Sequence, residues 1–127
     1  MNFPSDLKYS EHDEWVRTEG DEAVIGITDF AQDALGELVF IDLPEVGVDL
    51  AAGDVLCEVE SVKAVAEVYA NFGCQVVAVN EDLDGNEENV NNDPYGAGWL
   101  VRVKIVDGAG LESLMDADAY QAKIADA

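Results

Sequence analysis

The sequence predicts a mainly β fold, either a sandwich or a flattened barrel, with a few short helices. Two observations favour this class. Six short runs are rich in Val, Ile and aromatic residues, and turns of Gly, Pro and acidic residues separate them. Such closely spaced strands are typical of a sandwich or barrel and not of alternating βαβ units. The length of 127 residues suits one hydrophobic core, so we expect one domain over residues 1–127.

The predicted strands follow one another with short turns between them. In chain order they are Glu22–Ile27, Leu38–Leu43, Val55–Glu60, Val65–Tyr69, Gln75–Val79 and Trp99–Val106.

A short helix is predicted from Thr28 to Gly36. Thr28 can cap its first turn, and Gly36 can end it. The spacing predicts that the core-facing residues are Ala31, Ala34 and Leu35.

A second helix is predicted over Leu111–Ala125, near the end of the chain. Ser113 or Asp116 can cap it, and we expect it to lie against the sheet. Residues at roughly helical spacing are Leu114, Met115, Tyr120 and Ile124.

The chain is strongly acidic, with 28 Asp and Glu against six Lys and Arg and a formal net charge of -22. This charge excludes non-specific attraction to nucleic acid or to an anionic membrane, and leaves basic partners as candidates. Adaptation to high salt is a second explanation, since salt screens like-charge repulsion. The sequence has neither a long apolar run nor a signal peptide, so we expect a monomeric cytoplasmic protein.

Two motifs suggest chemistry only weakly. Cys57 and Cys74 lie 17 positions apart without a C-x-x-C pair, so we expect free thiols packed as small hydrophobic residues and no zinc site. Catalysis by either thiol with His12 is disfavoured, and no catalytic residue is expected. The segment Asn80-x-Asp82-x-Asp84-Gly85 resembles half of a calcium loop but has Asn91 where a bidentate Glu is required, so calcium binding is disfavoured too.

Lys63 is the only basic residue between Thr18 and Val101. Alternating apolar residues on both sides predict two half-buried strands, Val55–Glu60 and Val65–Tyr69, that place Ser61, Val62 and Lys63 at the crest of a hairpin. There the stem of the lysine would point away from the body and into a partner's active site. The simpler alternative is an ordinary solvated lysine in a turn.

Segments on both sides of Lys63 match one known family in collinear order. Around the lysine the match is Gly53-Asp54 followed by Val59-Glu-Ser-Val-Lys-Ala64. The further matches are Gly26–Gln32, Leu35–Phe40, Leu43–Gly47, Val79-Asn80, Val90-Asn-Asn-Asp-Pro-Tyr-Gly-Ala-Gly-Trp-Leu100 and Met115–Tyr120. In these segments the chain resembles the glycine cleavage system H protein family. Biotin carrier domains differ, because their lysine lies between methionines, and lipoyl domains of 2-oxo acid dehydrogenases lack the Asn-Asp-Pro-Tyr-Gly-x-Gly-Trp segment.

The resemblance implies a single lipoyl-carrier domain of the lipoyl/biotinyl type, with lipoic acid joined to Lys63 through an amide. It implies a carrier and not an enzyme. The lipoyl arm would take an aminomethyl group from glycine decarboxylase (P protein) to a tetrahydrofolate-dependent aminomethyltransferase (T protein). Dihydrolipoyl dehydrogenase (L protein) would then reoxidise the arm, and a lipoate-attaching enzyme would be a fourth partner.

The family also implies a cleft that shelters the loaded arm. Because the adduct carries an ammonium group, we expect carboxylates such as Glu14 and Asp29 at its edge, near the hairpin residues Ser61 and Glu67. The alternative for Glu14 is exposure beside a buried Trp15. The acids nearest Lys63 are expected to form a docking surface for partner enzymes, and they are Glu58, Glu60 and Glu67.

Two other functions remain open: an acidic non-catalytic interaction domain, and a lipoyl relay protein that serves other lipoyl-dependent complexes. The chain also departs from the family at two places. His12 lies one position earlier than in the family's His-Glu-Trp, so no role is carried over to it. Asn71-Phe-Gly-Cys74 replaces a Pro-x-Ser-Gly turn, and Asn71 and Gly73 are expected to adopt left-handed conformations there.

Overall fold

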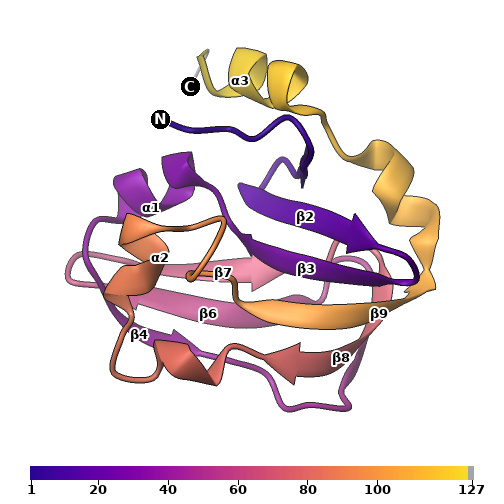
Figure 1. The fold of residues 1–127 in the computed structure, drawn as a ribbon, viewed down its shortest axis with the longest axis horizontal. Helices are drawn as coiled ribbons and strands as arrows, with labels where there is room; N and C mark the ends of the chain where they lie inside the picture. The colour runs from indigo at the N-terminus through magenta and orange to yellow at the C-terminus, as the bar shows by residue number, and fades with distance from the viewer. Residues whose placement is uncertain (126–127) are drawn as a thin grey trace.

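Two antiparallel sheets face each other in the computed structural model, which describes residues 1–125 (Figure 1). Across the larger sheet the strands are β1 (Lys8–Tyr9), β2 (Glu14–Glu19), β3 (Glu22–Ile27), β9 (Val101–Asp107), β8 (Gly73–Val79) and β5 (Asp49–Leu50). Across the smaller sheet they are β4 (Leu38–Asp42), β6 (Val55–Ser61) and β7 (Val65–Tyr69). Within residues 1–125 the sheets do not close into a barrel, so the mainly β prediction is confirmed in its sandwich form.

Short helices connect and cover the strands. They are α1 (Asp29–Leu35), the 3₁₀ helix η1 (Glu81–Leu83), α2 (Glu88–Asn92), the 3₁₀ helix η2 (Gly108–Ser113) and α3 (Ala117–Ala125). Among the described residues, no helix has the length and apolar character needed to cross a membrane.

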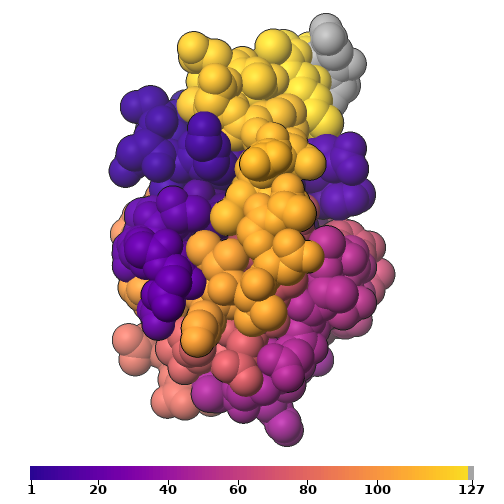
Figure 2. Space-filling model, turned by 90° about the vertical axis from the view of Figure 1, so that its right-hand side faces the viewer, coloured from indigo at the N-terminus to yellow at the C-terminus, as the bar shows by residue number. Residues whose placement is uncertain are grey.

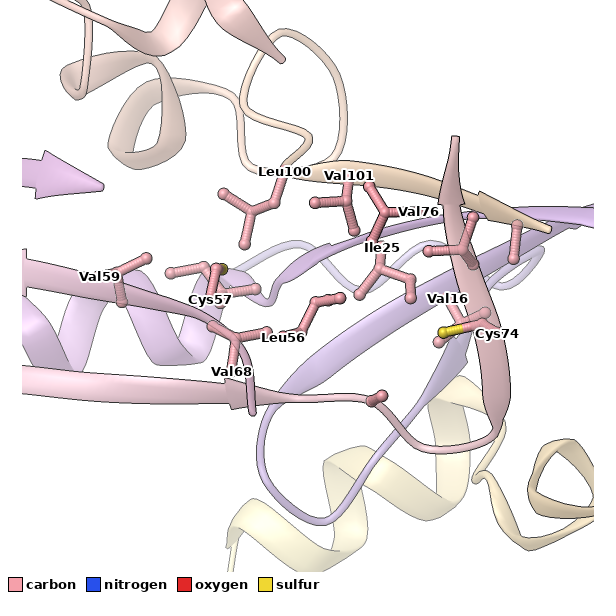
Figure 3. Close-up of a cluster of buried hydrophobic side chains, with 14 of the residues drawn as sticks. Val16, Ile25, Leu56, Cys57, Val59, Val68, Cys74, Val76, Leu100 and Val101 are labelled. Carbon is pink, nitrogen blue, oxygen red and sulfur yellow. The ribbon is translucent and has the colours of Figure 1, made fainter. Parts of the chain in front are cut away.

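The main hydrophobic core lies between the two sheets (Figure 3). Val16 and Ile25 of the larger sheet meet Leu56 and Val59 of the smaller one, and all four are at most 3% exposed. Burying each such side chain stabilises the fold by about 1.5–3 kcal/mol. The two cysteines belong to this core as free thiols, as predicted.

The predicted hairpin strands contain an irregularity that alternation does not reveal. A β-bulge between Val55 and Cys57 shifts the register against β7, so that Leu56 and Cys57 are both buried whereas Val55 is 42% exposed. The alternation predicted for Val55–Glu60, which would put Val55 and Cys57 on one face and Leu56 on the other, is therefore wrong at the start of this strand. Beyond the bulge, Val59 faces the core and its neighbours in β6 face outwards, as predicted.

Helix α1 begins and ends as predicted. Thr28 Oγ1 accepts a hydrogen bond from Ala31 N (3.2 Å), and Gly36 follows the last residue with φ +80°. Ala31 and Leu35 pack against the core, but Ala34 is exposed, so its predicted core position is wrong. One short helix presents a narrow stripe to the sheet, and Ala34 falls beside that stripe.

The C-terminal segment, orange to yellow in Figure 2, runs over the surface of the molecule and is helical over a shorter stretch than predicted. Met115 is extended because its backbone exchanges two hydrogen bonds with that of Tyr9, Tyr9 N to Met115 O at 2.8 Å and Met115 N to Tyr9 O at 2.7 Å. Asp116 then caps α3 by accepting from Ala119 N (2.8 Å), in line with one of the two predicted caps. Pairing with β1 thus divides the predicted Leu111–Ala125 helix into the end of η2, three non-helical residues (114–116) and α3.

Helix α3 is fastened to the fold by Tyr120. Its ring stacks on Tyr9 with centroids 4.9 Å apart, and its hydroxyl donates to Asp13 Oδ1 and contacts Thr28 Oγ1, both at 2.8 Å. Asp13 is the one described non-glycine residue with a positive φ, +70°. The C-terminal helix therefore helps to hold the N-terminus of α1.

The altered turn after Tyr69 uses ordinary backbone conformations. Neither Asn71 nor Gly73 has a positive φ, so the expected left-handed conformations are wrong. Glycine is needed at 73 for space instead, because a Cβ there would lie 2.9 Å from Asp107 Cβ on β9.

Candidate functional site

Lys63 lies at the tip of the β6–β7 hairpin, where Ser61 closes the turn. Ser61 N donates to Ala64 O (2.8 Å), while Ser61 Oγ accepts from Lys63 N (3.2 Å) and from Ala64 N (3.0 Å). Ser61 is buried and Lys63 is exposed. The Ser61 hydroxyl thus shapes a tight turn that presents the lysine to solvent.

The tip is anchored to the connection between α1 and β4. Val62 N donates to Glu37 O (3.1 Å), and a Cβ placed on Gly36 would lie 3.6 Å from Lys63 Cε. The lysine stem therefore rests beside Gly36 instead of pointing straight away from the body. At φ +80° and ψ -157°, Gly36 has a conformation open to glycine alone.

Asn91 of α2 braces this connection. Its Nδ2 donates to Gly36 O (2.8 Å) and to Gln32 Oε1 (3.0 Å), and its Oδ1 accepts from Leu38 N (3.0 Å). Glu37, whose backbone oxygen accepts from Val62 N, lies between Gly36 and Leu38, two of the residues that Asn91 contacts. One amide side chain thus links α2 to the hairpin tip through three hydrogen bonds and one short loop.

A polar groove of about 400 Å³ lies beside the same connection. Its carboxylates are Asp33, Glu37 and Glu88, and no Lys or Arg lines it. None of the ion pairs within residues 1–125 involves Lys63. Lys63 is therefore exposed without an ion pair among the described residues, and the groove beside Gly36, which its stem approaches, is acidic.

Carboxylates also form a row across the outer face of the smaller sheet. Asp42 of β4 lies opposite Glu58 of β6, which lies opposite Glu67 of β7. All three are exposed. Like charges directly opposite each other destabilise a sheet, so this row has no structural benefit of its own.

On the same face, the next row of side chains toward the hairpin tip has an apolar residue on each side of an acid. Glu60 lies between Phe40 on β4 and Val65 on β7, which are 52% and 59% exposed. Val62 at the tip is 67% exposed. The predicted docking acids Glu58, Glu60 and Glu67 therefore share one face with exposed apolar groups, immediately beside Lys63.

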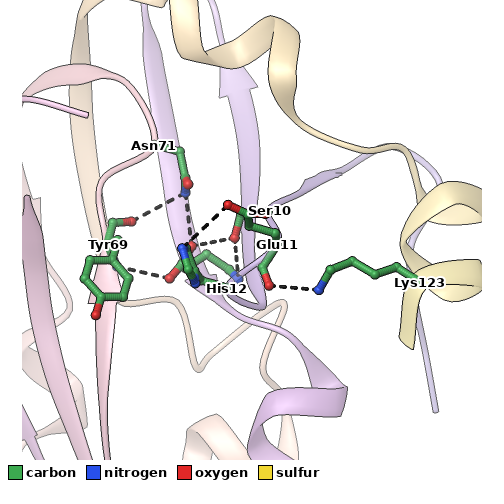
Figure 4. Close-up of polar contacts among 7 residues, drawn as sticks. Ser10, Glu11, His12, Tyr69, Asn71 and Lys123 are labelled. Atoms are coloured by element: carbon green, nitrogen blue, oxygen red, sulfur yellow. Dashed lines mark hydrogen bonds and ion pairs between the residues drawn. The ribbon is translucent and has the colours of Figure 1, made fainter. Parts of the chain in front are cut away.

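Glu14 occupies a buried position at the start of β2, with 1% exposure. Its carboxylate accepts hydrogen bonds from Ser10 Oγ, from Tyr69 N (3.0 Å) and from Asn71 Nδ2 (3.1 Å). Figure 4 shows these three donor residues, Ser10, Tyr69 and Asn71, within one network of polar contacts. The alternative of an exposed Glu14 beside buried Trp15 is wrong. Glu14 joins β2 to the end of β7 that is remote from Lys63.

Asp29 lies in the first turn of α1 and is held by two contacts. Its Oδ2 accepts from Asn2 N (2.9 Å) and its Oδ1 from Gln32 Nε2 (2.7 Å). The seven residues of α1 separate it from Gly36 by about 10 Å. Asp29 and Lys63 are therefore at opposite ends of this helix.

The remaining candidate groups offer no catalytic centre. Burial raises the pKa of the Cys57 thiol far above its ordinary range, and burial with nearby Asp49 and Asp54 raises that of Cys74 to about 11. His12 is exposed over the Tyr69 ring, with centroids 5.0 Å apart. Within residues 1–125 no three His, Cys, Asp or Glu side chains come together as metal ligands.

Sequence reasoning missed four residues that build the site: Gly36, Glu37, Asp42 and Asn91. A signal existed for Asp42, because alternation within the predicted strand Leu38–Leu43 places it on the outer face with the other acids. The brace by Asn91 depends on a contact between residues 55 positions apart, which no local pattern reveals.

Comparison with known proteins agrees with this arrangement. The model of the family described as glycine cleavage H-protein matches residues 7–127. The chain belongs to the glycine cleavage H-protein family. The predicted resemblance is thereby confirmed.

Several members of the glycine cleavage H-protein family are similar over nearly their whole length. The glycine cleavage system H protein of Aeromonas salmonicida (strain A449) is 52% identical over 121 residues, which cover 94% of each chain. That of Mycobacterium avium (strain 104) is 54% identical over 125 residues, covering 94% of this chain and 95% of the other. A crystal structure of a glycine cleavage system H protein from Mycobacterium marinum superposes with a TM-score of 0.88 at 37% identity, covering 97% and 99% of the two chains.

Proposed function

We propose that this chain is the lipoyl-bearing shuttle of glycine cleavage, with lipoic acid attached through an amide to Lys63. In this role it carries an aminomethyl group from glycine decarboxylase to the tetrahydrofolate-dependent aminomethyltransferase, and dihydrolipoyl dehydrogenase then reoxidises the arm. The chain itself acts as a carrier and not as an enzyme. Membership of the H-protein family supports the carrier role.

The position of Lys63 carries this proposal. The lysine is exposed at a turn that Ser61 closes and Glu37 anchors, and none of the ion pairs within residues 1–125 occupies its amine. These residues fit the group, because attachment needs an accessible Nζ that loses its proton and bonds to an activated carboxyl as the leaving group departs. When bound, the lipoyl group supplies a strained five-membered disulfide that reduction opens readily.

We further propose that the outer face of the smaller sheet binds the partner enzymes. Glu58, Glu60 and Glu67 supply negative charge, and Phe40 and Val65 supply exposed apolar contacts beside them. Interfaces commonly combine an apolar centre with charges that steer the encounter. For the loaded arm, Glu14, Asp29, Ser61 and Glu67 remain the proposed cleft residues. Ser61 and Glu67 are the two of these that belong to the hairpin.

Mass analysis of the protein from its native host tests the attachment site. We expect one lipoyl group per chain, localised to Lys63 by peptide fragmentation, and none on Lys63→Arg, which keeps the charge but cannot form this amide. A lipoyl group on another residue, or none where other proteins of the host are lipoylated, would falsify the assignment. An acidic interaction domain would give this second result.

Transfer kinetics at low salt test the docking face. Glu58→Lys should slow aminomethyl transfer several-fold, and the effect should shrink as salt screens the charges. Glu112→Lys makes the same charge change on the exposed 3₁₀ helix η2 and should leave the rate unchanged. Equal rates for the two variants would remove Glu58 from the docking surface. Passage of the lipoyl group from the loaded chain to a 2-oxo acid dehydrogenase domain would favour the relay alternative.

A further inference from the structure

Strand β7 is an edge strand that begins two residues after Lys63. It pairs with β6 on one side, and within residues 1–125 no strand pairs with its other side. Edge strands expose backbone N–H and C=O groups, and proteins commonly cover or interrupt them. The state of this edge therefore matters for anything that approaches Lys63.

The register determines which backbone groups of β7 point outwards. Ser61 N donates to Ala64 O, so this pair is hydrogen-bonded across the hairpin. Bonded and non-bonded pairs alternate in an antiparallel ladder. Ala66 and Val68 therefore bond to β6, and the N–H and C=O groups of Val65, Glu67 and Tyr69 point to the free edge.

The far end of this edge is closed by side chains. Tyr69 N donates to Glu14 Oε2 (3.0 Å), and Tyr69 O accepts from Asn71 Nδ2 (3.4 Å). These contacts confirm that Tyr69 faces outwards, as the alternation requires. The described part of the chain provides no such partner for Val65 or Glu67. The outward backbone N–H and C=O groups of Val65 and Glu67 are thus left without a partner in the described residues, directly beside Lys63.

We propose that the enzyme that attaches the lipoyl group docks on this open edge, adding an extended basic segment of its own beside Val65 and Glu67. Such strand addition gains affinity from backbone hydrogen bonds and specificity from alternate side chains. The inference rests on the proposed modification of Lys63. It concerns how the lysine is recognised, which the proposed function leaves open.

The attaching enzyme must come closer to Lys63 than the enzymes that act on the lipoyl ring. A lysine side chain spans roughly 6 Å, so an enzyme acting on Nζ must touch the residues that flank Lys63. The enzymes that use the lipoyl ring meet it at the end of a much longer arm and can dock farther away. An edge two residues from the lysine therefore suits the attaching enzyme best.

Charge and apolar surface define the segment that fits. Glu67 ends the row of Asp42 and Glu58 at the free edge, so a strand added there would place a Lys or Arg opposite Glu67. Val65 is 59% exposed and would pair with an apolar side chain. The occupant is thus an extended segment with alternating basic and apolar residues on one face.

Amide hydrogen exchange resolved by residue tests the proposal. The unmodified protein would be measured alone and with a saturating amount of the attaching enzyme, without lipoate or nucleotide. We expect exchange of the Val65 and Glu67 amides to slow at least tenfold, with little change at Ala66 and Val68, which already bond to β6. Unchanged exchange at Val65 and Glu67 in the complex overturns strand addition, even where the same enzyme lipoylates Lys63 and the proposed function stands.

A proline variant gives a second, independent test. Glu67→Pro removes an outward N–H that no internal bond uses, which an edge strand tolerates. Glu67→Ala removes the same side chain but keeps the N–H. We expect kcat/KM for lipoylation to fall at least tenfold more in the proline variant, mainly through KM, with circular dichroism confirming the fold of both. Equal values contradict the proposal, and if the proline variant does not fold, the exchange measurement decides.

Discussion

Replacing Glu14 by Gln tests whether the buried carboxylate holds the two sheets together. Three donors surround it: the Ser10 hydroxyl, Tyr69 N–H and the Asn71 amide. A carboxamide has one acceptor oxygen, so its NH₂ group must face one of those donors. Hydrogen bonds to a charged group contribute about 1.5–3 kcal/mol each, and an unpaired buried donor costs about 1–3 kcal/mol. Since the Ser10 hydroxyl can rotate, we expect a net loss of about 2 kcal/mol.

Urea unfolding followed by tryptophan fluorescence measures this loss. With a slope of about 2 kcal/mol per M, the midpoint should fall by about 1 M. The measurement belongs in about 1 M salt, where the loss of one negative charge is screened. Glu11→Gln removes the same charge from a side chain that is 75% exposed and should change the free energy of unfolding by less than about 0.5 kcal/mol. A Glu14→Gln protein as stable as this control would refute the structural role assigned to Glu14.

Four further predictions concern Asn91, Gly36, Cys74 and the net charge of the chain. Asn91→Ala should lower the free energy of unfolding by about 1–3 kcal/mol and slow lipoylation, whereas Asn86→Ala, which loses one exposed contact to Asp82 O, should do neither. Gly36→Ala forces a Cβ into a glycine conformation and should cost about 1–3 kcal/mol in urea unfolding; no loss would contradict the strain. Since burial raises the pKa of Cys74 to about 11, above that of an unfolded thiol, the stability contributed by Cys74 should be constant below about pH 8.5 and decline towards pH 11, so the free energy of unfolding should fall less over this range in Cys74→Ala. With a net charge of -22, the urea midpoint should rise with salt; no rise would rule out the salt-adaptation hypothesis.

Local pattern predicted much of this fold. Period-two alternation located six of the nine strands to within two residues at either end, and the Thr28 and Gly36 signals bounded α1 correctly. The two-residue strands β1 and β5 carry too little pattern to detect. β2 was missed because Glu14, a charged residue, is buried at its start, which breaks the expected alternation.

The residues that failed prediction depend on contacts between distant segments. Met115 has helical spacing, yet pairing with Tyr9 makes it extended. Leu56 faces the core because a bulge, invisible in the sequence, shifts the register of β6. For the site, sequence alone placed Lys63 at a hairpin tip. The loop that anchors the tip is set by Asn91, and one residue cannot signal a partner 55 positions away.

The brace by Asn91 has a consequence for the order of events during synthesis. The tip that presents Lys63 is complete only when α2 has folded against the α1–β4 connection, so the ribosome must first release a residue 28 positions beyond the lysine (91 − 63). A chain that is still emerging from the ribosome, or one in which α2 has misfolded, carries the same turn residues 61–64 without the brace from Asn91. If Lys63 carries the cofactor as proposed, an attaching enzyme that needs the braced tip would modify only chains in which α2 already packs against the α1–β4 connection.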